Sequence, residues 1–284
     1  MSSGPGDPEF SRAPARKALG QHFLFDPDIL RRTALAAGPV EGRTVIEVGP
    51  GPGGLTRALL QQGADPLIAV EADARFADAL QDWPEAKQGR LHVHQADARR
   101  AHWRDLIAAA GGTAPAMIVA NLPYNVGTVL LVDWLKAGGW RGEMALMFQK
   151  EVAERACAAP GSSHYGRLAV LSQAVCRTHI AFTLPPGAFR PPPKVDSAVA
   201  VFTPLPDSER FDDLESLEQV AGAAFGQRRK MLRAALKALA RANDLIAEDW
   251  LAGCGIDPTA RAETVDQAGF RRLATSLAVA RSRG

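Results

Sequence analysis

Short apolar runs recur through the first two thirds of the chain, and segments with a helical period separate them. A run of roughly four to eight apolar residues bounded by turn signals is typical of a buried strand in a parallel sheet. Strands are expected at 44–48, 66–70, 91–94, 116–120, 143–148, 168–175, 180–184 and 198–202. Helices are expected at 27–37, 55–63 and 129–136. Strands that alternate with helices predict an α/β fold.

The pattern changes near residue 203, where a proline-broken segment precedes an acidic helix start. Beyond it the apolar residues follow a helical period. They are Leu232, Leu236 and Leu239, and then Phe270, Leu273 and Leu277. We therefore expect a disordered tail at 1–14, an α/β domain at 15–203 and a smaller all-helical domain at 204–284.

A glycine-rich turn follows the first expected strand and holds four glycines within residues 49–54. Because glycine lets a backbone approach a ligand closely, Gly49 and Gly51 are expected to line a small-molecule site. The glycine spacing also matches dinucleotide-binding turns. Pro50 and Pro52, however, each remove a backbone N–H donor that a pyrophosphate would need. A ligand without phosphates fits this turn better.

The order Glu47-x-Gly49-x-Gly51-x-Gly53 resembles the first motif of class I methyltransferases that use S-adenosylmethionine. Two acidic residues at later strand ends suit that ligand. Glu71 lies about 20 positions beyond the glycines, where it is placed to accept hydrogen bonds from both ribose hydroxyls. Asp97, followed by Ala98, is expected to accept from the adenine amino group, and a helix cap is its alternative role. Asp73 is expected to begin a helix.

The tetrapeptide Asn121-Leu122-Pro123-Tyr124 carries the most specific chemistry in the chain. An exocyclic adenine nitrogen is a poor nucleophile because its lone pair is delocalised into the ring. The side-chain oxygen of Asn121 and the carbonyl of Leu122, held rigid by Pro123, can accept the two N–H bonds and free that lone pair. Tyr124 can stack on an extruded base. The tetrapeptide predicts N6-adenine methylation without a catalytic acid, nucleophile or metal.

A triple proline at 191–193 fixes an extended loop after Phe189. This loop is expected to present Phe189 as a second aromatic side chain against the extruded adenine. Burial of Phe189 in the core is the alternative.

Composition changes the picture little. Three cysteines, an odd number and far apart in sequence, indicate neither a disulfide framework nor a zinc site and suit a reducing cytoplasm. No apolar run approaches the roughly 18 residues that span a bilayer, so we expect no membrane association. We also expect no metal. The net charge of +2 alone says nothing about nucleic acid.

The distribution of charge is more informative. Basic residues follow Phe225 on what is expected to be one helix, uninterrupted by acidic residues: Arg228, Arg229, Lys230, Arg233, Lys237 and Arg241. Arg229, Arg233 and Lys237 are spaced four apart and share a face in such a helix. The helix is expected to bind RNA phosphates through Arg228, Arg229, Lys230, Arg233 and Lys237, with a solvated helix face as the alternative.

Four stretches of the chain resemble one family closely. They are LGQHFL at 19–24, NLPY at 121–124, QKEVAERACAAPGSSHYGRLAVLSQ at 149–173 and GIDPTARAE at 255–263. They are similar to the KsgA/RsmA family of rRNA adenine N6-dimethyltransferases, and the resemblance extends over about residues 17–275. The family usually has Asn at the position of His22.

The resemblance implies a Rossmann-like class I methyltransferase domain with a seven-stranded sheet, and a small helical domain that binds RNA. It implies S-adenosylmethionine as cofactor and an N-terminal segment, with Gln21, His22 and Leu24, that folds over it. It also implies transfer of four methyl groups to the N6 atoms of two adjacent adenines near the 3′ end of 16S rRNA. The expected substrate is the immature small ribosomal subunit, and the expected enzyme is a cytoplasmic monomer.

Two other functions remain open. A sister enzyme that methylates large-subunit rRNA would share the fold, but its family typically carries Ile after the Asn and lacks the FGQRRK segment found at 225–230. A non-catalytic relative that binds RNA or promoters is the second alternative. The intact glycine turn, Glu71, Asp97 and the NLPY tetrapeptide favour an active enzyme.

Overall fold

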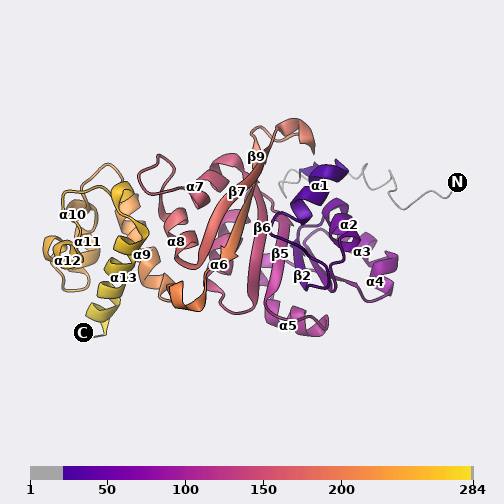
Figure 1. Ribbon diagram of the computed structural model, residues 1–284, viewed down its shortest axis with the longest axis horizontal. Helices are drawn as coiled ribbons and strands as arrows, with labels where there is room; N and C mark the ends of the chain where they lie inside the picture. The colour runs from indigo at the N-terminus through magenta and orange to yellow at the C-terminus, as the bar shows by residue number, and fades with distance from the viewer. Residues whose placement is uncertain (1–21, 283–284) are drawn as a thin grey trace. The chain divides into compact units, whose positions relative to one another are not determined.

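The computed structural model describes residues 22–282 (Figure 1), so the predictions for the tail at 1–14 and for Gln21 lie outside it. The chain forms two compact units. The first runs up to Ala153 and continues with Ile180–Thr203, and the second comprises Glu154–His179 and Pro204–Gly284. The second unit therefore takes in residues 154–179, which the sequence pattern assigns to the α/β domain.

A seven-stranded sheet confirms the predicted α/β fold. Its strands are β2 (Val45–Val48), β3 (Leu67–Glu71), β4 (Leu91–Gln95), β5 (Ala116–Asn121), β6 (Arg141–Gln149), β7 (Cys176–Leu184) and β9 (Ser197–Pro204). Their order across the sheet is β4-β3-β2-β5-β6-β9-β7. The five strands from β4 to β6 are parallel, and β9 runs antiparallel to β6.

The chain passes from β2 outward to β3 and β4, then crosses back to place β5 on the other side of β2. Such a reversal opens a crevice at the carboxyl ends of the two central strands, where parallel sheets bind ligands. All residues of β2 and β3 are buried, in agreement with their continuous apolar runs. β4 is partly exposed, as expected for a strand at the sheet edge.

The first unit contains several helices, two of which begin at an aspartate cap. They include α1 (Pro27–Ala34), α2 (Gly54–Gln61), α3 (Ala74–Gln81), α4 (Pro84–Lys87), α5 (Trp103–Ala109) and α6 (Gly127–Lys136), with α7 (Lys150–Cys157) at the boundary between the units. Asp26 caps α1 by accepting from the backbone N–H groups of Asp28 and Ile29. Asp73 caps α3, which confirms its predicted place at a helix start.

A separate two-stranded sheet pairs β1 (Phe23–Leu24) with β8 (Phe189–Arg190). Leu24 lies opposite Phe189, and both side chains are buried. This short ladder fixes the N-terminal segment to the proline-rich loop.

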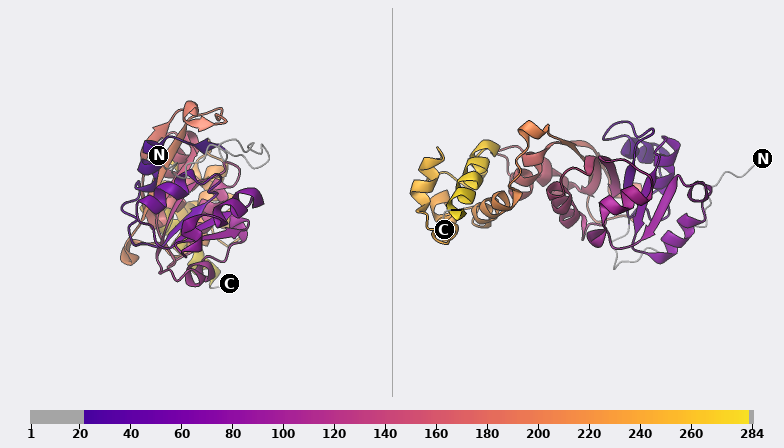
Figure 2. Two further views of the ribbon diagram at one scale, coloured as in Figure 1. Left: turned by 90° about the vertical axis from the view of Figure 1, so that its right-hand side faces the viewer. Right: turned by 90° about the horizontal axis from the view of Figure 1, so that it is seen from below.

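The second unit is mostly helical (Figure 2). Its helices are α8 (Arg167–Val175), α9 (Leu214–Gly226), α10 (Leu232–Ala235), α11 (Lys237–Arg241), α12 (Ala247–Gly253) and α13 (Gln267–Arg281). Phe225 stacks on Phe270 with ring centroids 5.5 Å apart, and Tyr165 meets Phe225 edge-on at 5.8 Å. Aromatic pairs in these geometries add to the burial energy of the core.

The prediction of a strand at 168–175 is wrong, because this segment forms helix α8. Seven of the nine residues of α8 are buried. A run that is apolar on every side has no diagnostic period, so the pattern alone cannot separate a buried helix from a buried strand.

The single basic helix predicted after Phe225 is also wrong. Arg228, Arg229 and Lys230 lie in a turn, and the chain resumes as two short helices, α10 and α11. The backbone N–H of Leu232 donates to Ala260 at 2.8 Å, and that of Arg233 donates to Pro258 at 3.1 Å. These tertiary acceptors replace the carbonyls that one continuous helix would supply.

Candidate cofactor and target-base site

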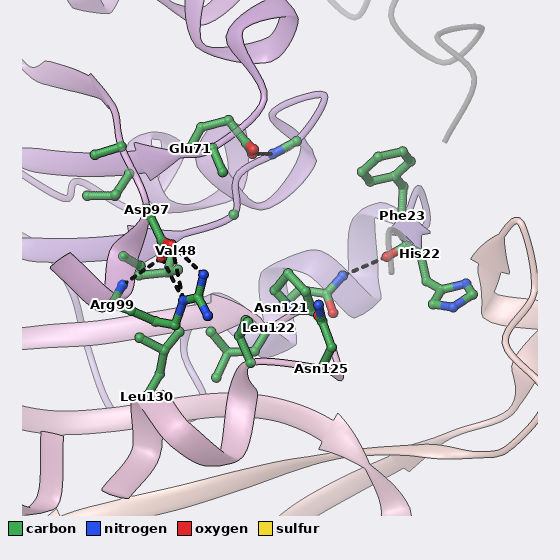
Figure 3. A pocket seen from close by; sticks show the side chains of 18 residues that line it. His22, Phe23, Val48, Glu71, Asp97, Arg99, Asn121, Leu122, Asn125 and Leu130 are labelled. Carbon is green, nitrogen blue, oxygen red and sulfur yellow. Dashed lines mark hydrogen bonds and ion pairs between the residues drawn. The ribbon is translucent and has the colours of Figure 1, made fainter. Parts of the chain in front are cut away.

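A pocket opens at the carboxyl ends of β2, β3, β4 and β5 and contains most of the predicted site residues (Figure 3). Those that line it are His22, Gly49, Gly51, Glu71, Asp97, Ala98, Asn121, Leu122 and Pro123. The sequence did not single out nine other lining residues: Phe23, Val48, Val70, Ala72, Ala96, Arg99, Asn125, Val126 and Leu130. Most of these are direct neighbours of predicted residues, so strand-end position alone could have indicated them.

The glycine turn gives the pocket its close backbone wall. Gly51 has φ +53°, and a Cβ atom built there would lie 2.6 Å from Cε1 of Phe23. Only glycine therefore allows the N-terminal segment to pack across the turn. Phe23 in turn meets Phe76 of α3 edge-on, with ring centroids 5.5 Å apart.

Glu71 enters the pocket from the end of β3 with acceptor capacity to spare. Its Oε2 accepts from the backbone N–H of Gly51 at 2.9 Å, and its Oε1 accepts from that of Asp73 at 2.8 Å. Each carboxylate oxygen has about two lone-pair sites, so one on each oxygen is left for a ligand. Burial raises the pKa of Glu71, against the opposing effect of these hydrogen bonds. Two remaining acceptors suit a pair of ribose hydroxyls.

Asp97 is placed at the end of β4 as predicted, but its carboxylate is already engaged. It caps the short 3₁₀-helix η3 (Ala98–Arg100) and binds the Arg99 side chain, with Oδ2 2.6 Å from Nη2. These hydrogen bonds lower the pKa of Asp97 to about 2. The helix-cap alternative therefore describes the observed contacts, and Asp97 remains an anion across the physiological pH range.

Asn121 ends β5 and has one possible amide orientation. Its Nδ2 lies 2.9 Å from the carbonyl oxygen of His22, and a carbonyl can only accept. The amide nitrogen must therefore face His22. Among residues 22–282, none donates a hydrogen bond to Oδ1, so this oxygen is available to a ligand. An acceptor at this position is what the N6 methylation chemistry needs.

Tyr124 lies beside the pocket rather than in its lining. Its hydroxyl shares a 2.7 Å hydrogen bond with Ser197 Oγ, and its ring centroid is 5.4 Å from that of His22. Nδ1 of His22 lies 2.8 Å from the Pro191 carbonyl, so this nitrogen carries the proton. Burial raises the pKa of Tyr124. The predicted stacking residue thus contacts His22 of the N-terminal segment and Ser197 at the start of β9.

Two predicted contacts differ in the structure. Phe189, expected to face the extruded base, is 2% exposed and packs in the hydrophobic core. Leu24, expected at the cofactor, is buried in the same core. The cause is the β1–β8 ladder, which places Leu24 and Phe189 opposite each other and directs both inward.

Glu47 is a fully buried acid at the centre of the sheet, immediately before the glycine turn. Its exposed fraction is 1%, and its Oε2 has no hydrogen-bond partner among the described residues. Burial raises the pKa of Glu47 to about 8, and the nearby charge of Glu71 adds to the shift. Glu47 therefore supports the turn mainly in its neutral form near pH 7.

Three separate features converge on one ligand class. The turn lacks the donors for phosphates, Glu71 offers two acceptors for ribose hydroxyls, and Asn121 offers an acceptor beside them. Across residues 22–282 there is no group of three potential metal ligands and no helix suited to crossing a membrane. The sheet order together with this pocket defines a class I methyltransferase that uses S-adenosylmethionine.

Comparison with known proteins supports this class and narrows it. The model of the family "Ribosomal RNA adenine dimethylase" matches residues 12–278. A Ribosomal RNA small subunit methyltransferase A from Maricaulis maris is 47% identical over 271 residues, covering 95% of this chain and 93% of the relative. One from Jannaschia sp. is 52% identical over 263 residues, covering 92% and 88%. The chain belongs to the ribosomal RNA adenine dimethylase family.

Solved structures show the same fold at lower identity. A dimethyladenosine transferase from Plasmodium falciparum has a TM-score of 0.74 at 24% identity, covering 91% of this chain and 98% of that one. The 23S rRNA methyltransferase ErmE has a TM-score of 0.66 at 24% identity, covering 90% and 99%. One of these proteins is named a dimethyladenosine transferase and the other a 23S rRNA methyltransferase, yet both share this fold. The fold alone therefore does not show which RNA this protein methylates.

Proposed function

We propose that this protein dimethylates the N6 atoms of two adjacent adenines near the 3′ end of 16S rRNA, as a monomer acting on immature small subunits in the cytoplasm. Relatives that are 47–52% identical over more than 90% of this chain are named small subunit methyltransferases. The Leu that follows Asn121 supports the same substrate, because the sister family that methylates large-subunit rRNA typically carries Ile at this position.

In this proposal the cofactor lies across the glycine turn. Glu71 accepts from its ribose hydroxyls, Asp97 from its adenine amino group, and His22 and Phe23 enclose it from the N-terminal side. The free lone pairs of Glu71 and the close approach allowed by Gly51 support this placement. When bound, S-adenosylmethionine supplies a methyl group activated by its positive sulfonium.

The target adenine is held by groups at the end of β5. The Oδ1 atom of Asn121 and the carbonyl of Leu122 accept hydrogen bonds from the two N6 N–H groups, which turns the nitrogen lone pair out of conjugation with the ring. Tyr124 stacks on the base and Ser197 fixes the Tyr124 hydroxyl. The observation that carries this assignment is the Nδ2 contact to His22, because it leaves Oδ1 as the atom facing the pocket. Positioning does most of the catalytic work.

The RNA is bound in part by exposed Arg and Lys side chains of the second unit. Arg229, Lys230, Arg233 and Lys237 are exposed to solvent. Arg228 is set apart from them, because its guanidinium donates to Ser162 within that unit and lies 4.0 Å from Glu263. Phosphate contacts of this kind supply affinity without reading sequence.

The decisive experiment combines the protein and S-adenosylmethionine with a labelled methyl group, in one reaction with immature small subunits and in a parallel reaction with immature large subunits. The RNA is then digested and its nucleosides are separated. We expect N6,N6-dimethyladenosine at two adjacent positions near the 3′ end, and none with Asn121→Ala. Label in large-subunit RNA alone would favour the sister activity. Cofactor binding without transfer to either subunit would favour the non-catalytic alternative.

A further inference from the structure

Arg99 contacts the cofactor pocket at the position predicted to recognise adenine. It follows Asp97 by two residues in η3, and its side chain is 54% exposed. Figure 3 shows its guanidinium turned onto the Asp97 carboxylate.

Three N–H groups of Arg99 engage both oxygens of Asp97. Oδ1 accepts from the Arg99 backbone N–H at 3.0 Å. The single Nε–H is shared between Oδ1 at 3.0 Å and Oδ2 at 3.1 Å. Oδ2 also accepts from Nη2 at 2.6 Å. An ionised carboxylate has about four lone-pair sites, so Arg99 faces most of them.

We propose that Arg99 competes with the adenine amino group of the cofactor for the Asp97 carboxylate, so that the Arg99 side chain weakens adenosine binding. This inference rests on the proposed role of Asp97. Both Asp97 oxygens already face the guanidinium, so a close hydrogen bond from the amino group to either oxygen has to compete with it.

The alternative is that Arg99 holds Asp97 in place for the cofactor. The backbone contact argues against it, because the Arg99 N–H already fixes Oδ1 as the cap of η3. The guanidinium adds neutralising charge and occupies acceptors, and neither effect favours a further donor.

Competition has a consequence for turnover. The methyl donor and its demethylated product both carry adenosine, so Arg99 weakens the binding of each. Dimethylation of two adenines needs four rounds of cofactor exchange, and weaker product binding shortens each exchange.

The test is calorimetric titration with S-adenosylhomocysteine, which binds without turnover, and with its analogue that lacks the 6-amino group. Arg99→Leu should bind S-adenosylhomocysteine about three- to tenfold more tightly than wild type. Its affinity for the deamino analogue should be unchanged. Arg100→Leu is the matched control, since it removes the adjacent charge without touching an Asp97 hydrogen bond, and it should change neither affinity. Arg99→Lys keeps the charge but removes the two-nitrogen fork and should fall between wild type and Arg99→Leu.

The outcomes distinguish a failure of the Arg99 inference from a failure of the adenine-binding role proposed for Asp97. Asp97→Ala should weaken binding of S-adenosylhomocysteine, and adding Arg99→Leu to it should cause no further change. If Asp97→Ala weakens binding while Arg99→Leu leaves it unchanged or weakens it, competition is refuted and Asp97 keeps its role. If Asp97→Ala changes nothing, the adenine assignment is itself wrong and the inference about Arg99 falls with it. Equal tightening by Arg100→Leu would point to charge alone and would also refute competition.

Discussion

The side-chain amide of Asn121 is oriented by a main-chain carbonyl, and this single contact decides which of its atoms can meet a substrate. The Nδ2 donor bonds to His22, so the oxygen is left as the acceptor. Tyr124 is fixed in a comparable way through Ser197. At the scale of single residues, hydrogen bonds within the protein occupy the Asn121 donor and leave its oxygen as the acceptor for a substrate.

Replacing Asn121 by Ala should lower the single-turnover rate of methyl transfer by about 100- to 1000-fold at saturating RNA, because the reacting nitrogen then loses one of its two positioned acceptors. Affinity for S-adenosylhomocysteine should change far less. Asn125→Ala is the control, since Asn125 lines the same pocket without the His22 contact. Near-normal rates for Asn121→Ala would contradict the proposed base platform.

The buried acid Glu47 should make stability depend on pH. Its folded pKa of about 8 lies above the ordinary value of 4.5, so the folded state retains a proton that the unfolded state releases. Its contribution is fully present below about pH 4.5 and is lost as pH rises through 8. Glu47→Gln should remove this loss, which is on the order of a few kcal/mol between pH 5 and 8.

Thermal unfolding of wild type and Glu47→Gln across this pH range measures the effect. The exposed Glu41→Gln serves as the control for the same chemical change. Parallel pH dependence in the wild type and Glu47→Gln would show that Glu47 does not titrate in this range.

At the scale of elements, the turn between β2 and α2 brings the N-terminal segment over the pocket. Gly51→Ala should destabilise the fold by about 1–2 kcal/mol, because alanine is strained at the positive φ of this position. The clash of the added Cβ with Phe23 should in addition weaken cofactor binding. Gly42→Ala separates the two causes, because Gly42 has φ +64° but no atom near its added Cβ. Thermal unfolding and calorimetry measure both effects. Equal cofactor affinity in the two variants would argue against packing of Phe23 over the turn in the bound state.

The scale of the whole molecule concerns how RNA is held. Charge reversal at Arg229 and Arg233 should weaken binding to immature small subunits and flatten its salt dependence, by roughly 0.7–0.9 in log–log slope for each phosphate that the protein no longer neutralises. Cofactor affinity should not change. Arg104→Glu, a charge reversal at one exposed residue of α5, is the control. Binding measured across a salt series checks the prediction, and an unchanged slope would place the RNA-binding surface elsewhere.

Several features were determined by the sequence alone, because they depend on neighbours along the chain. Apolar runs indicated the buried strands, and strand-end positions indicated Glu71 and Asp97. The local order of Asn121-Leu122-Pro123-Tyr124 indicated adenine chemistry. Helix caps such as Asp73 were likewise readable, since a cap bonds to backbone groups only a few residues away.

Other features were decided only by the tertiary structure, because they depend on partners far away in the chain. The carbonyl that orients Asn121 belongs to a residue 99 positions earlier. Phe189 is buried because β8 pairs with β1, and the basic segment breaks because residues near 260 accept the bonds of Leu232 and Arg233. Arg99 is close to Asp97 in sequence, yet only the folded geometry shows that three of its N–H groups face the two oxygens of that carboxylate. Local pattern places a side chain at the site, and long-range packing decides which of its atoms remain free.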